Sequence, residues 1–422
     1  MDCLKPYSHI RGANYIPPSF VHFEMNDPVI LDKEMSYAER LGLNSVRVYL
    51  HYEGWKNNPK AYLERVREFM RLANSHGITV MFVLWDSFRF FRWTYDESEK
   101  KWIYMPDALY NLEPSFWPHG EEYIQSVVET LSPEPNLLMW DIMNEPLCPI
   151  LLHMSPYSQE CRDLMQKMWS FVRHFCRLMK DLDNKHPITV GATKSRIWDI
   201  SEVLEVGADI DVISIHDYSP DRAALRKNID EGISFAQEFQ KPLLISEIGC
   251  LCRANPYDMA LEICQEYGIG WYLWELMIRG YWADVHGIVY PDGTVRNPSI
   301  VAAIRGFFRK RTGDIIKPKV DREHHASLDI LAGKKWLSNP NADYKEGLRI
   351  LERIANHLEA CELIPMNDPP TRRVLLLSEE KPENRAELCR LLVLWSEILS
   401  QHCQPLPPEI PLKNPGYRWW RE

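Results

Sequence analysis

Residues 78–84 read Ile78-Thr79-Val80-Met81-Phe82-Val83-Leu84, an almost unbroken apolar run rich in β-branched side chains. Such a run is typical of a β-strand that is buried on both faces, as the strands of parallel sheets are. Similar runs recur between residues 10 and 274. Together they predict eight strands: Ile10–Tyr15, Ser45–Leu50, Ile78–Trp85, Leu137–Asn144, Pro187–Gly191, Asp211–His216, Pro242–Ile248 and Ile269–Trp274.

Amphipathic stretches between these runs predict helices. Within residues 165–179 the apolar side chains recur at steps of three and four, which predicts a helix with one face on a core. A second stretch, residues 63–73, is followed by His76-Gly77, where glycine favours the end of a helix. Eight strand–helix repeats over about 300 residues favour a closed (β/α)8 barrel over an open doubly wound sheet, and no glycine-rich phosphate-binding motif follows a predicted strand. We therefore expect no nucleotide cofactor.

The alternation of strands and helices stops near Gly313. We therefore expect an α/β protein in two parts, a (β/α)8 barrel over residues 1–312 and a mostly helical extension over residues 313–422. Two amphipathic helices are predicted in the extension, at residues 348–361 and 388–399. We expect the extension to pack on the barrel, and an independent domain is the alternative.

Composition narrows the choice of partner. The chain has 49 basic and 59 acidic residues, a net charge of −10, which argues against nucleic acid or an anionic membrane as the partner. Its 15 Trp, 19 Tyr and 14 Phe offer flat rings on which sugars stack, although aromatic cores and protein interfaces are also rich in such residues. The connection from Asp86 to Pro118 is especially aromatic, and its length predicts a functional loop.

The first residues, the apolar runs and the cysteines indicate where in the cell the protein is expected. The sequence starts without a basic segment followed by an apolar one, and no apolar run approaches the roughly 18 residues of a membrane span. Cys250 and Cys252 lack a second pair or histidines at zinc-ligand spacing, so we expect no metal site there. These features predict a soluble, cytoplasmic protein, and they say nothing of its oligomeric state.

Two glutamates end predicted strands. Glu145 follows Leu138-Met139-Trp140-Asp141-Ile142-Met143-Asn144, and Glu247 lies near the end of Leu243-Leu244-Ile245-Ser246-Glu247. In a barrel the carboxyl ends of the strands meet above the core, so the two acids would face one site. A carboxyl pair can cleave a glycosidic bond, bind a divalent metal, or, for one of the acids, form a buried ion pair with Arg47. The neighbouring residue types suit hydroxyl recognition better than a metal.

These motifs resemble those of clan A glycoside hydrolases. Trp140-Asp141-Ile142-Met143-Asn144-Glu145-Pro146 is similar to their fourth-strand Asn-Glu-Pro signature, and Ser246-Glu247-Ile248-Gly249 is similar to their seventh-strand nucleophile motif. Arg47, the pair His216 and Tyr218, Trp274 and the segment Gly287–Thr294 also match the pattern of family 5. The resemblance covers most of residues 10–309 and implies a TIM barrel that hydrolyses carbohydrate.

By this resemblance Glu145 is the general acid/base, Glu247 the nucleophile, and Asn144 the residue that holds the sugar 2-hydroxyl. Charge and shape add that Arg47 keeps Glu247 ionised, Tyr218 hydrogen-bonds it, His216 orients substrate or acid, and Trp274 forms the floor of the sugar site. Many members of the family place a histidine after the third strand, where this chain has Asp86 and Ser87. We expect Trp85, Asp86 and Glu275 to line the cleft.

The predicted activity is retaining hydrolysis of β-linked glucosides, mannosides or short β-glycan oligosaccharides without a metal or other cofactor. The sugar, the linkage and the choice between internal and terminal cleavage are left open. Two other functions compete with it: a catalytically inactive barrel that binds carbohydrate, and a scaffold whose C-terminal helices bind another protein.

Overall fold

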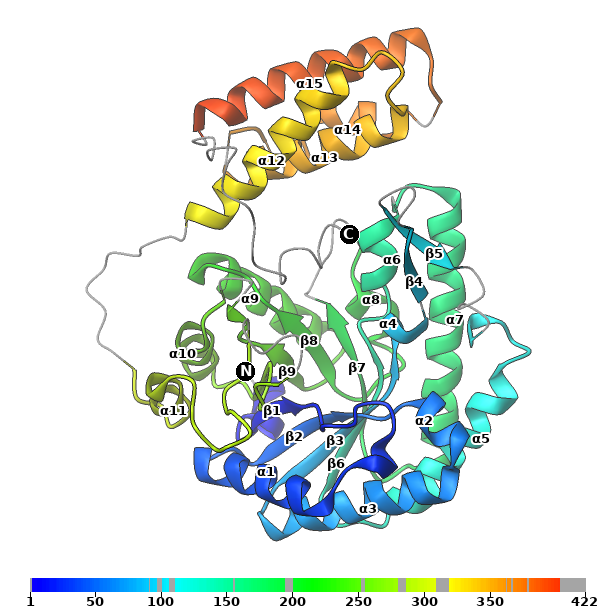
Figure 1. Cartoon of the computed structure of the whole chain (residues 1–422), viewed down its shortest axis with the longest axis vertical. Coiled ribbons are helices and arrows are strands. Elements are labelled where there is room, and N and C mark those ends of the chain that lie inside the picture. The colour runs from blue at the N-terminus through cyan, green and yellow to red at the C-terminus, as the bar shows by residue number, and fades with distance from the viewer. Residues whose placement is uncertain are drawn as a thin grey trace. The chain divides into compact units, whose positions relative to one another are not determined.

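The computed structural model describes residues 2–90, 92–96, 101–105, 111–154, 156–193, 200–251, 255–279, 286–308, 319–361, 363–365, 367–377 and 379–402 (Figure 1). The chain divides into two compact units at the boundary between Thr312 and Gly313. Each unit is described by itself.

The first unit is a closed barrel. Eight parallel strands of the described residues follow one another around it in the order β1-β10-β9-β8-β7-β6-β3-β2. They are β1 (Arg11–Tyr15), β2 (Ser45–Tyr49), β3 (Thr79–Asp86), β6 (Leu137–Asn144), β7 (Ile188–Thr193), β8 (Ile213–Asp217), β9 (Leu243–Ile248) and β10 (Trp271–Leu273). Each of them overlaps one of the eight predicted strands, so the predicted (β/α)8 barrel is confirmed.

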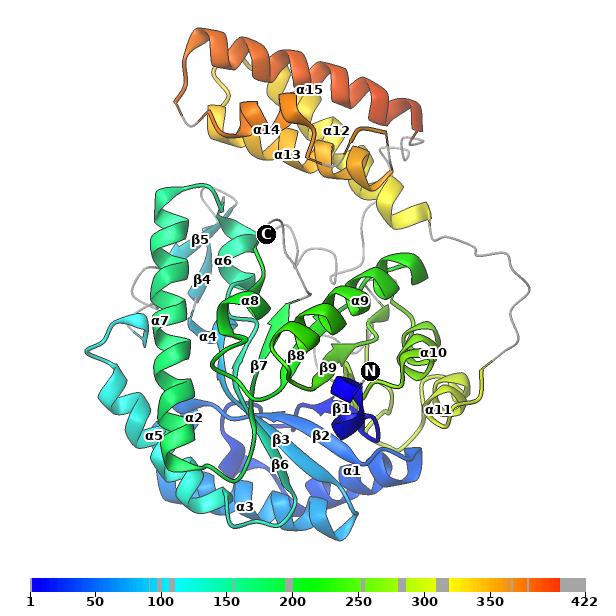
Figure 2. The same cartoon turned by 180° about the vertical axis from the view of Figure 1, so that it is seen from behind.

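Helices surround the strands, as Figures 1 and 2 show from opposite sides. They are α1 (Pro28–Leu41), α2 (Tyr52–Asn57), α3 (Pro59–Ser75), α5 (Trp117–Leu131), α6 (Cys148–His153), α7 (Gln159–Leu182), α8 (Glu202–Val206), α9 (Arg222–Glu238), α10 (Tyr257–Tyr267) and α11 (Pro298–Ile304). Two short 3-10 helices, η1 (Asp2–Tyr7) and η2 (Phe23–Met25), flank β1.

Local sequence sets the ends of these helices. The Asn58 side chain accepts a hydrogen bond from the backbone N–H of Ala61, and Pro59 takes the first position of α3, which is where proline is tolerated. At the other end Gly77 has a φ of 69°, a left-handed conformation that glycine adopts at little cost. The helix end predicted at His76-Gly77 is thus confirmed, and β3 begins two residues later.

Apolar side chains form two layers around the strands. One small cluster draws on six strands or the residues just before them, and its members can meet only inside the barrel: Ile10, Met81, Met139, Val212, Leu244 and Tyr272. A far larger cluster packs the outer faces of the strands against the helices, and it includes the predicted stripe of α7 at Met168, Trp169, Val172, Phe175, Cys176 and Met179. Both layers are mainly apolar, so a cluster of charged side chains is expected toward the carboxyl ends of the strands.

The connection after β3 is more ordered than a loop. It contains α4 (Ser87–Phe90) and an antiparallel pair, β4 (Arg92–Asp96) and β5 (Lys101–Met105). The prediction of one long loop was therefore wrong, although the β-branched and aromatic residues of both strands are a recognisable strand signal. The side chains of residues 91–110 lie outside the description, so the expected function of their aromatic rings stays a prediction.

The second unit is helical in its described part, which confirms the expected helical extension. Its helices are α12 (Lys319–Leu337), α13 (Tyr344–Ala360), α14 (Pro369–Leu375) and α15 (Pro382–His402). Leu351, Ile354 and Leu358 of α13 pack with Leu388 and Leu392 of α15 in a core that this unit builds from its own residues. The aromatic residues 417, 419 and 420 lie outside the described residues. Among the helices described in either unit, none is both long and apolar enough to cross a membrane.

Candidate active site

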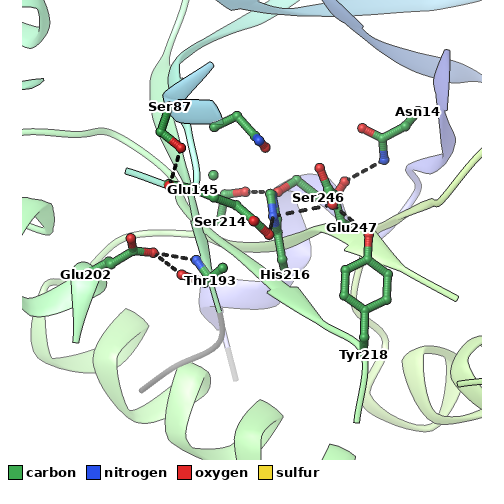
Figure 3. A network of polar contacts seen from close by, with 12 residues as sticks. Asn14, Ser87, Glu145, Thr193, Glu202, Ser214, His216, Tyr218, Ser246 and Glu247 are labelled. Atoms are coloured by element: carbon green, nitrogen blue, oxygen red, sulfur yellow. Dashed lines mark hydrogen bonds and ion pairs between the residues drawn. The ribbon is translucent and has the colours of Figure 1, made fainter. Parts of the chain in front are cut away.

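Glu145 and Glu247 meet at the carboxyl ends of the barrel strands. Glu145 directly follows β6, and Glu247 is the second-last residue of β9. His216 of β8 lies next to Glu247 (Figure 3). One ligand atom from each of these three side chains lies within 4.8 Å of the other two. Both glutamates are largely buried, with 6% and 5% of their surface exposed. The structure thus brings together two acids that are 102 positions apart in the sequence.

Glu247 is surrounded by hydrogen-bond donors. Its Oε1 accepts hydrogen bonds from Arg47 Nη1 at 2.6 Å and from the Tyr49 hydroxyl at 2.9 Å, and its Oε2 accepts one from the Tyr218 hydroxyl at 2.6 Å. His216 Nδ1 lies 3.5 Å from the same Oε2. Burial raises the pKa of Tyr49, so its hydroxyl remains a donor. Every one of these contacts favours a carboxylate over a carboxylic acid.

The charge state of Glu247 follows from this environment. Burial by itself raises the pKa of the carboxyl, but the charges of His216 and Arg47 and the hydrogen bonds from Tyr218 and Tyr49 outweigh burial, and the pKa lies below its usual range. Glu247 is therefore ionised at neutral pH.

Arg47 connects Glu247 to the rest of the site. The guanidinium is fully buried, and its Nε and Nη2 donate to Asp141 Oδ2 at 2.9 and 2.8 Å. Nη1 also donates to Asn14 Oδ1 at 2.9 Å, and Nη2 to Asn144 Oδ1 at 2.9 Å. One cation thus holds two carboxylates and two amides in place. The buried ion pair with Arg47 that the sequence raised as an alternative does exist for Glu247, and it lies within the site.

Gly191 of β7 leaves the space that this network occupies. A Cβ at this position would lie 2.8 Å from both Arg47 Nη2 and His216 Nε2 and 3.0 Å from Asp141 Oδ2. We expect Gly191→Ala to displace these groups and to lower kcat/KM by about 100-fold, because small misplacements of catalytic groups are costly. Steady-state kinetics with an aryl β-glycoside measures this.

The matched control is Gly120→Ala in α5. Its Cβ would lie 2.5 Å from the Phe175 ring, so it crowds the apolar helix layer and touches none of the polar groups. Overpacking of this kind costs about 1–3 kcal/mol of stability, so Gly120→Ala should lower the melting temperature and leave kcat/KM near the parent value. Equal activity loss in the two variants would mean that the polar network has no special sensitivity.

The backbone of Glu145 is held in an unusual conformation. Its φ of 43° lies in the left-handed region, which costs a non-glycine residue about 1–3 kcal/mol. Its N–H donates to Gly191 O at 2.7 Å, and its carbonyl accepts hydrogen bonds from Ser87 Oγ at 2.6 Å and Cys148 N at 3.1 Å. This geometry turns the side chain toward His216, whose Nδ1 lies 2.8 Å from Glu145 Oε1.

Asn144 and Asp86 form the side of the site next to Glu145. Arg47 donates to Asn144 Oδ1 and the Tyr49 hydroxyl lies 3.1 Å from the same oxygen, so the amide Nδ2 points the other way and donates to Asp86 Oδ1 at 3.1 Å. The pKa of Asp86 is raised to about 6, mainly by burial and further by the charge of Glu145. The hydrogen bonds from Asn144 and Phe88 N act in the opposite direction and only partly offset this rise. Asp86 is thus a partly exposed acceptor that the structure places at the site.

The raised pKa of Asp86 makes folding depend on pH. The folded chain keeps this proton up to about pH 6, whereas the unfolded chain releases it near 3.8. Between pH 3.8 and about pH 6 the folded chain therefore binds a proton that the unfolded chain has lost. The free energy of unfolding falls as the pH rises through this range and stays lower above it. We expect Asp86→Asn to lack this fall and to be more stable than the parent above pH 6, by up to about 3 kcal/mol.

Urea unfolding of both proteins on either side of pH 6 measures this difference. The control is Asp292→Asn, where hydrogen bonds from Thr294 lower the pKa of an exposed carboxyl. The control should gain no stability above pH 6. A parent and an Asp86→Asn variant with the same pH profile would contradict the assignment.

Trp274 and Glu275 follow β10. The Trp274 ring is partly exposed and meets the Tyr49 ring edge-on at 6.4 Å between centroids, which places it beside Glu247. Glu275 is buried, and its Oε1 lies 2.9 Å from His286 Nδ1. Burial raises the pKa of Glu275, and the charge of Glu247 contributes to the rise, so the two carboxyls lie close enough to interact.

Trp85 does not line the site, and this prediction was wrong. Its side chain is 3% exposed and packs among rings of α5 and α7, with centroids 5.2 Å from Tyr123, 5.3 Å from Phe171 and 5.2 Å from Phe175. Strict alternation from Met81, which faces the barrel interior, would turn Trp85 inward, but its ring contacts show that the side chain points outward, as that of Leu84 does. Trp85 therefore belongs to the layer between the strands and the helices.

Several site residues were absent from the sequence-based candidates: Asn14, Tyr49, Ser87 and Asp141. Asp141 had a signal, because an acid inside the apolar run of residues 137–143 must find a buried partner. Asn14 and Tyr49 lie within predicted strands, where only the three-dimensional register shows which face they occupy.

Among the described residues, one group of side chains has the geometry to hold a metal ion: Glu145, His216 and Glu247. Two carboxylates and an imidazole are an acceptable ligand set for a transition metal. Arg47, however, already donates to Glu247 at 2.6 Å, and its charge opposes a second cation on that carboxylate. The absence of a metal stays a prediction, and the effect of a chelator on activity tests it.

Comparison with known proteins identifies the family of this chain and supports its fold. The sequence model of the family Cellulase (glycosyl hydrolase family 5) matches residues 20–280. Among solved structures, an endo-1,4-β-mannanase from Rhizomucor miehei is similar with a TM-score of 0.50 and 16% identity over 71% of this chain and 93% of that one. No curated protein sequence matches the chain.

A second structural neighbour was solved with sugars. The GH5_18 protein from Streptomyces cattleya in complex with GlcNAc has a TM-score of 0.53 and 15% identity, over 72% of this chain and 81% of that one. A variant of it in complex with Manβ1-4GlcNAc has a TM-score of 0.54 and 16% identity over the same shares. At such identities the likeness shows the barrel fold alone.

Proposed function

Because the chain belongs to glycosyl hydrolase family 5, and is thus a glycoside hydrolase, we propose that it cleaves β-linked glucosides, mannosides or short β-glycan oligosaccharides with net retention of configuration. The observation that carries this proposal is that one carboxyl oxygen of Glu145 lies within 4.8 Å of one carboxyl oxygen of Glu247, too close for the attacking water molecule of an inverting enzyme to be held between the two groups. Retaining enzymes hold their two carboxyl groups about 5–5.5 Å apart, whereas inverting enzymes need about 6.5–9.5 Å to admit a water molecule.

In the first step Glu247 attacks the anomeric carbon. Glu145 gives its proton to the glycosidic oxygen, the bond between that oxygen and the anomeric carbon breaks, and a glycosyl ester forms on Glu247. The hydrogen bonds of Glu247 to Arg47, Tyr49 and Tyr218 support this role, because they favour the ionised carboxylate.

In the second step water replaces Glu247. Once Glu247 is an ester, it carries no negative charge, and Glu145 takes a proton from the water that attacks the anomeric carbon. The ester bond breaks and Glu247 leaves as a carboxylate, which restores the starting state. His216, at 2.8 Å from Glu145 and 3.5 Å from Glu247, is placed to stabilise whichever acid is ionised.

Substrate recognition is proposed for three residues around the acids. Asn144 is held by Arg47, which supports a role for its amide in binding the sugar 2-hydroxyl. Asp86 offers a carboxylate acceptor for a second hydroxyl, and the partly exposed Trp274 ring offers a flat surface for the sugar. Neutral sugars suit this site, because the carboxyl groups of Asp141, Glu145 and Glu247 contact Arg47 and His216 and would repel an acidic sugar.

The direct test is the stereochemistry of the first product. An aryl β-glucoside, an aryl β-mannoside and the matching short oligosaccharides are incubated with the enzyme, and NMR records which anomer forms first. A β-anomer is expected, and the better substrate identifies the sugar. An α-anomer as first product would overturn the retaining mechanism.

The role of Glu145 predicts a dependence on the leaving group. We expect Glu145→Gln to lower kcat/KM by about 10²- to 10⁴-fold for an alkyl glycoside, the usual worth of a general acid, and far less for a dinitrophenyl glycoside, which leaves without a proton. The ratio of kcat/KM for the two substrates, compared with the parent, measures this. Equal losses on both would show that Glu145 is not the acid.

A further inference from the structure

Glu202, a buried carboxylate outside the proposed hydrolytic steps, lies close to Glu145. It is the first residue of α8 and only 1% exposed. Its Oε1 accepts a hydrogen bond from Leu147 N at 2.6 Å. Its Oε2 accepts hydrogen bonds from Thr193 N at 2.5 Å and Thr193 Oγ1 at 2.6 Å (Figure 3). A carboxylate that accepts three short hydrogen bonds is firmly fixed.

These bonds join two segments that determine where Glu145 lies. Leu147 is two residues beyond Glu145, and Thr193 is the last residue of β7. Two residues earlier on the same strand, Gly191 O accepts the hydrogen bond from Glu145 N at 2.7 Å. Glu202 thus ties the chain after Glu145 to the strand that also anchors the Glu145 backbone.

Glu145 requires such anchoring. Its φ of 43° is in the left-handed region, and the next residue is Pro146, which favours an extended conformation in the residue before it. The backbone of Glu145 would relax toward that conformation unless both sides were held. Ser87 and Gly191 hold its carbonyl and N–H, and Glu202 holds the chain that follows.

We infer that Glu202 is a positioning residue that holds the Glu145 carboxyl in place for proton transfer, an inference that rests on the proposed function. It touches no substrate and acts through the backbone of residues 145–147. Burial raises the pKa of Glu202 to about 7, and the charge of Glu145 contributes, so the two carboxyls also interact electrostatically. The protein keeps a costly buried acid at this place because its carboxylate accepts from three donors at once.

The test is Glu202→Gln, which preserves size but replaces one acceptor oxygen by an NH₂ group that faces an N–H donor. For an alkyl glycoside we expect kcat/KM to fall by about 100-fold, as for other small misplacements of a catalytic group. For a dinitrophenyl glycoside kcat/KM should stay near the parent value, because bond cleavage then needs no proton from Glu145. A loss of stability alone would reduce both values equally.

Asp183→Asn is the matched control. Asp183 is also a buried acid, which accepts hydrogen bonds from Trp140 Nε1 at 2.9 Å and Lys185 N at 3.0 Å at the amino end of β7, away from Glu145. It should lower the melting temperature without changing the ratio of the two kcat/KM values. If Glu202→Gln also leaves that ratio unchanged, the inference is overturned.

A milder variant and a double variant complete the test. Thr193→Val removes one donor to Glu202 with little change in shape, so it should show the same leaving-group dependence to a smaller degree even if Glu202→Gln fails to fold. In a Glu145→Gln background Glu202→Gln should add little, since both act on one proton transfer. Multiplied losses would contradict the inference. If Glu145→Gln itself shows no leaving-group dependence, the proposed function fails instead.

Discussion

Glu247→Ala is expected to lower kcat/KM by about 10⁴-fold or more on every aryl β-glycoside that the parent cleaves, because removing the nucleophile removes the covalent route. Glu247 receives three hydrogen bonds of 2.6 to 2.9 Å from Arg47, Tyr49 and Tyr218, and these contacts lower its pKa and hold the ionised carboxylate in place. Steady-state kinetics with a dinitrophenyl β-glycoside measures the loss.

Azide gives this prediction a second readout. The space left by the Glu247 carboxylate admits a small anion, which attacks the anomeric carbon from the same side and yields an α-glycosyl azide. We expect azide to restore turnover of the Glu247→Ala variant with this product, identified by NMR. In Glu145→Ala the glycosyl ester still forms, so azide should yield the β-product. The same anomer from both variants would refute the assignment of the two roles.

Glu34→Gln is the control for the loss of a buried glutamate. Glu34 is 2% exposed and accepts hydrogen bonds from Tyr15 and Arg279 in the layer between the barrel and α1. Its replacement should reduce stability and leave kcat/KM near the parent value. Activity losses of similar size in Glu34→Gln and Glu247→Ala would show that burial, and not nucleophilic attack, explains the effect.

Arg47→Met is expected to destabilise the fold by about 3–5 kcal/mol and to abolish activity, because it leaves the carboxylates of Asp141 and Glu247 buried without their cation. Arg47 donates to Asp141, Asn14, Asn144, Tyr49 and Glu247 while no part of it is exposed. Urea unfolding measures the free energy, and aryl glycoside kinetics at a temperature where the variant is folded measures the activity.

Two further variants separate charge from geometry. Arg47→Lys keeps the charge but not the planar set of donors, so we expect part of the stability to return while activity stays low. Arg226→Met breaks an exposed ion pair with Glu266 of 2.7 Å, and it should cost less than about 1 kcal/mol. If Arg47→Met costs no more than Arg226→Met, the Arg47 network contributes nothing to folding.

The barrel was predictable because its signal is local. Most of the barrel strands are buried on both faces and are therefore apolar over several consecutive residues, and the longer helices around them show one apolar stripe. The connection after β3 was mispredicted as a loop because its two strands, β4 and β5, form a pair outside the barrel pattern. The repeat in the sequence identifies the barrel and says little of what is inserted into it.

The predicted site residues came from strand ends, where acids are rare unless they have a use. Glu145, Glu247, Arg47, Asn144, His216 and Tyr218 all meet in one hydrogen-bonded group. Trp85 was misplaced, because the alternation of β3 breaks between Leu84 and Trp85, whose side chains both pack in the layer against the helices. Sequence position alone did not distinguish Trp85 from Asp86.

The sequence by itself determined the eight strands of the barrel, the two glutamates and their neighbours in the motifs, because these depend on residue type and spacing within short segments. Only the tertiary structure decided which side chains share the site with them, such as Asn14, Tyr49 and Asp141, and how Glu202 reaches the segment after Glu145. Those contacts join residues far apart in the chain, and they depend on strand register and backbone conformation, which no local pattern encodes.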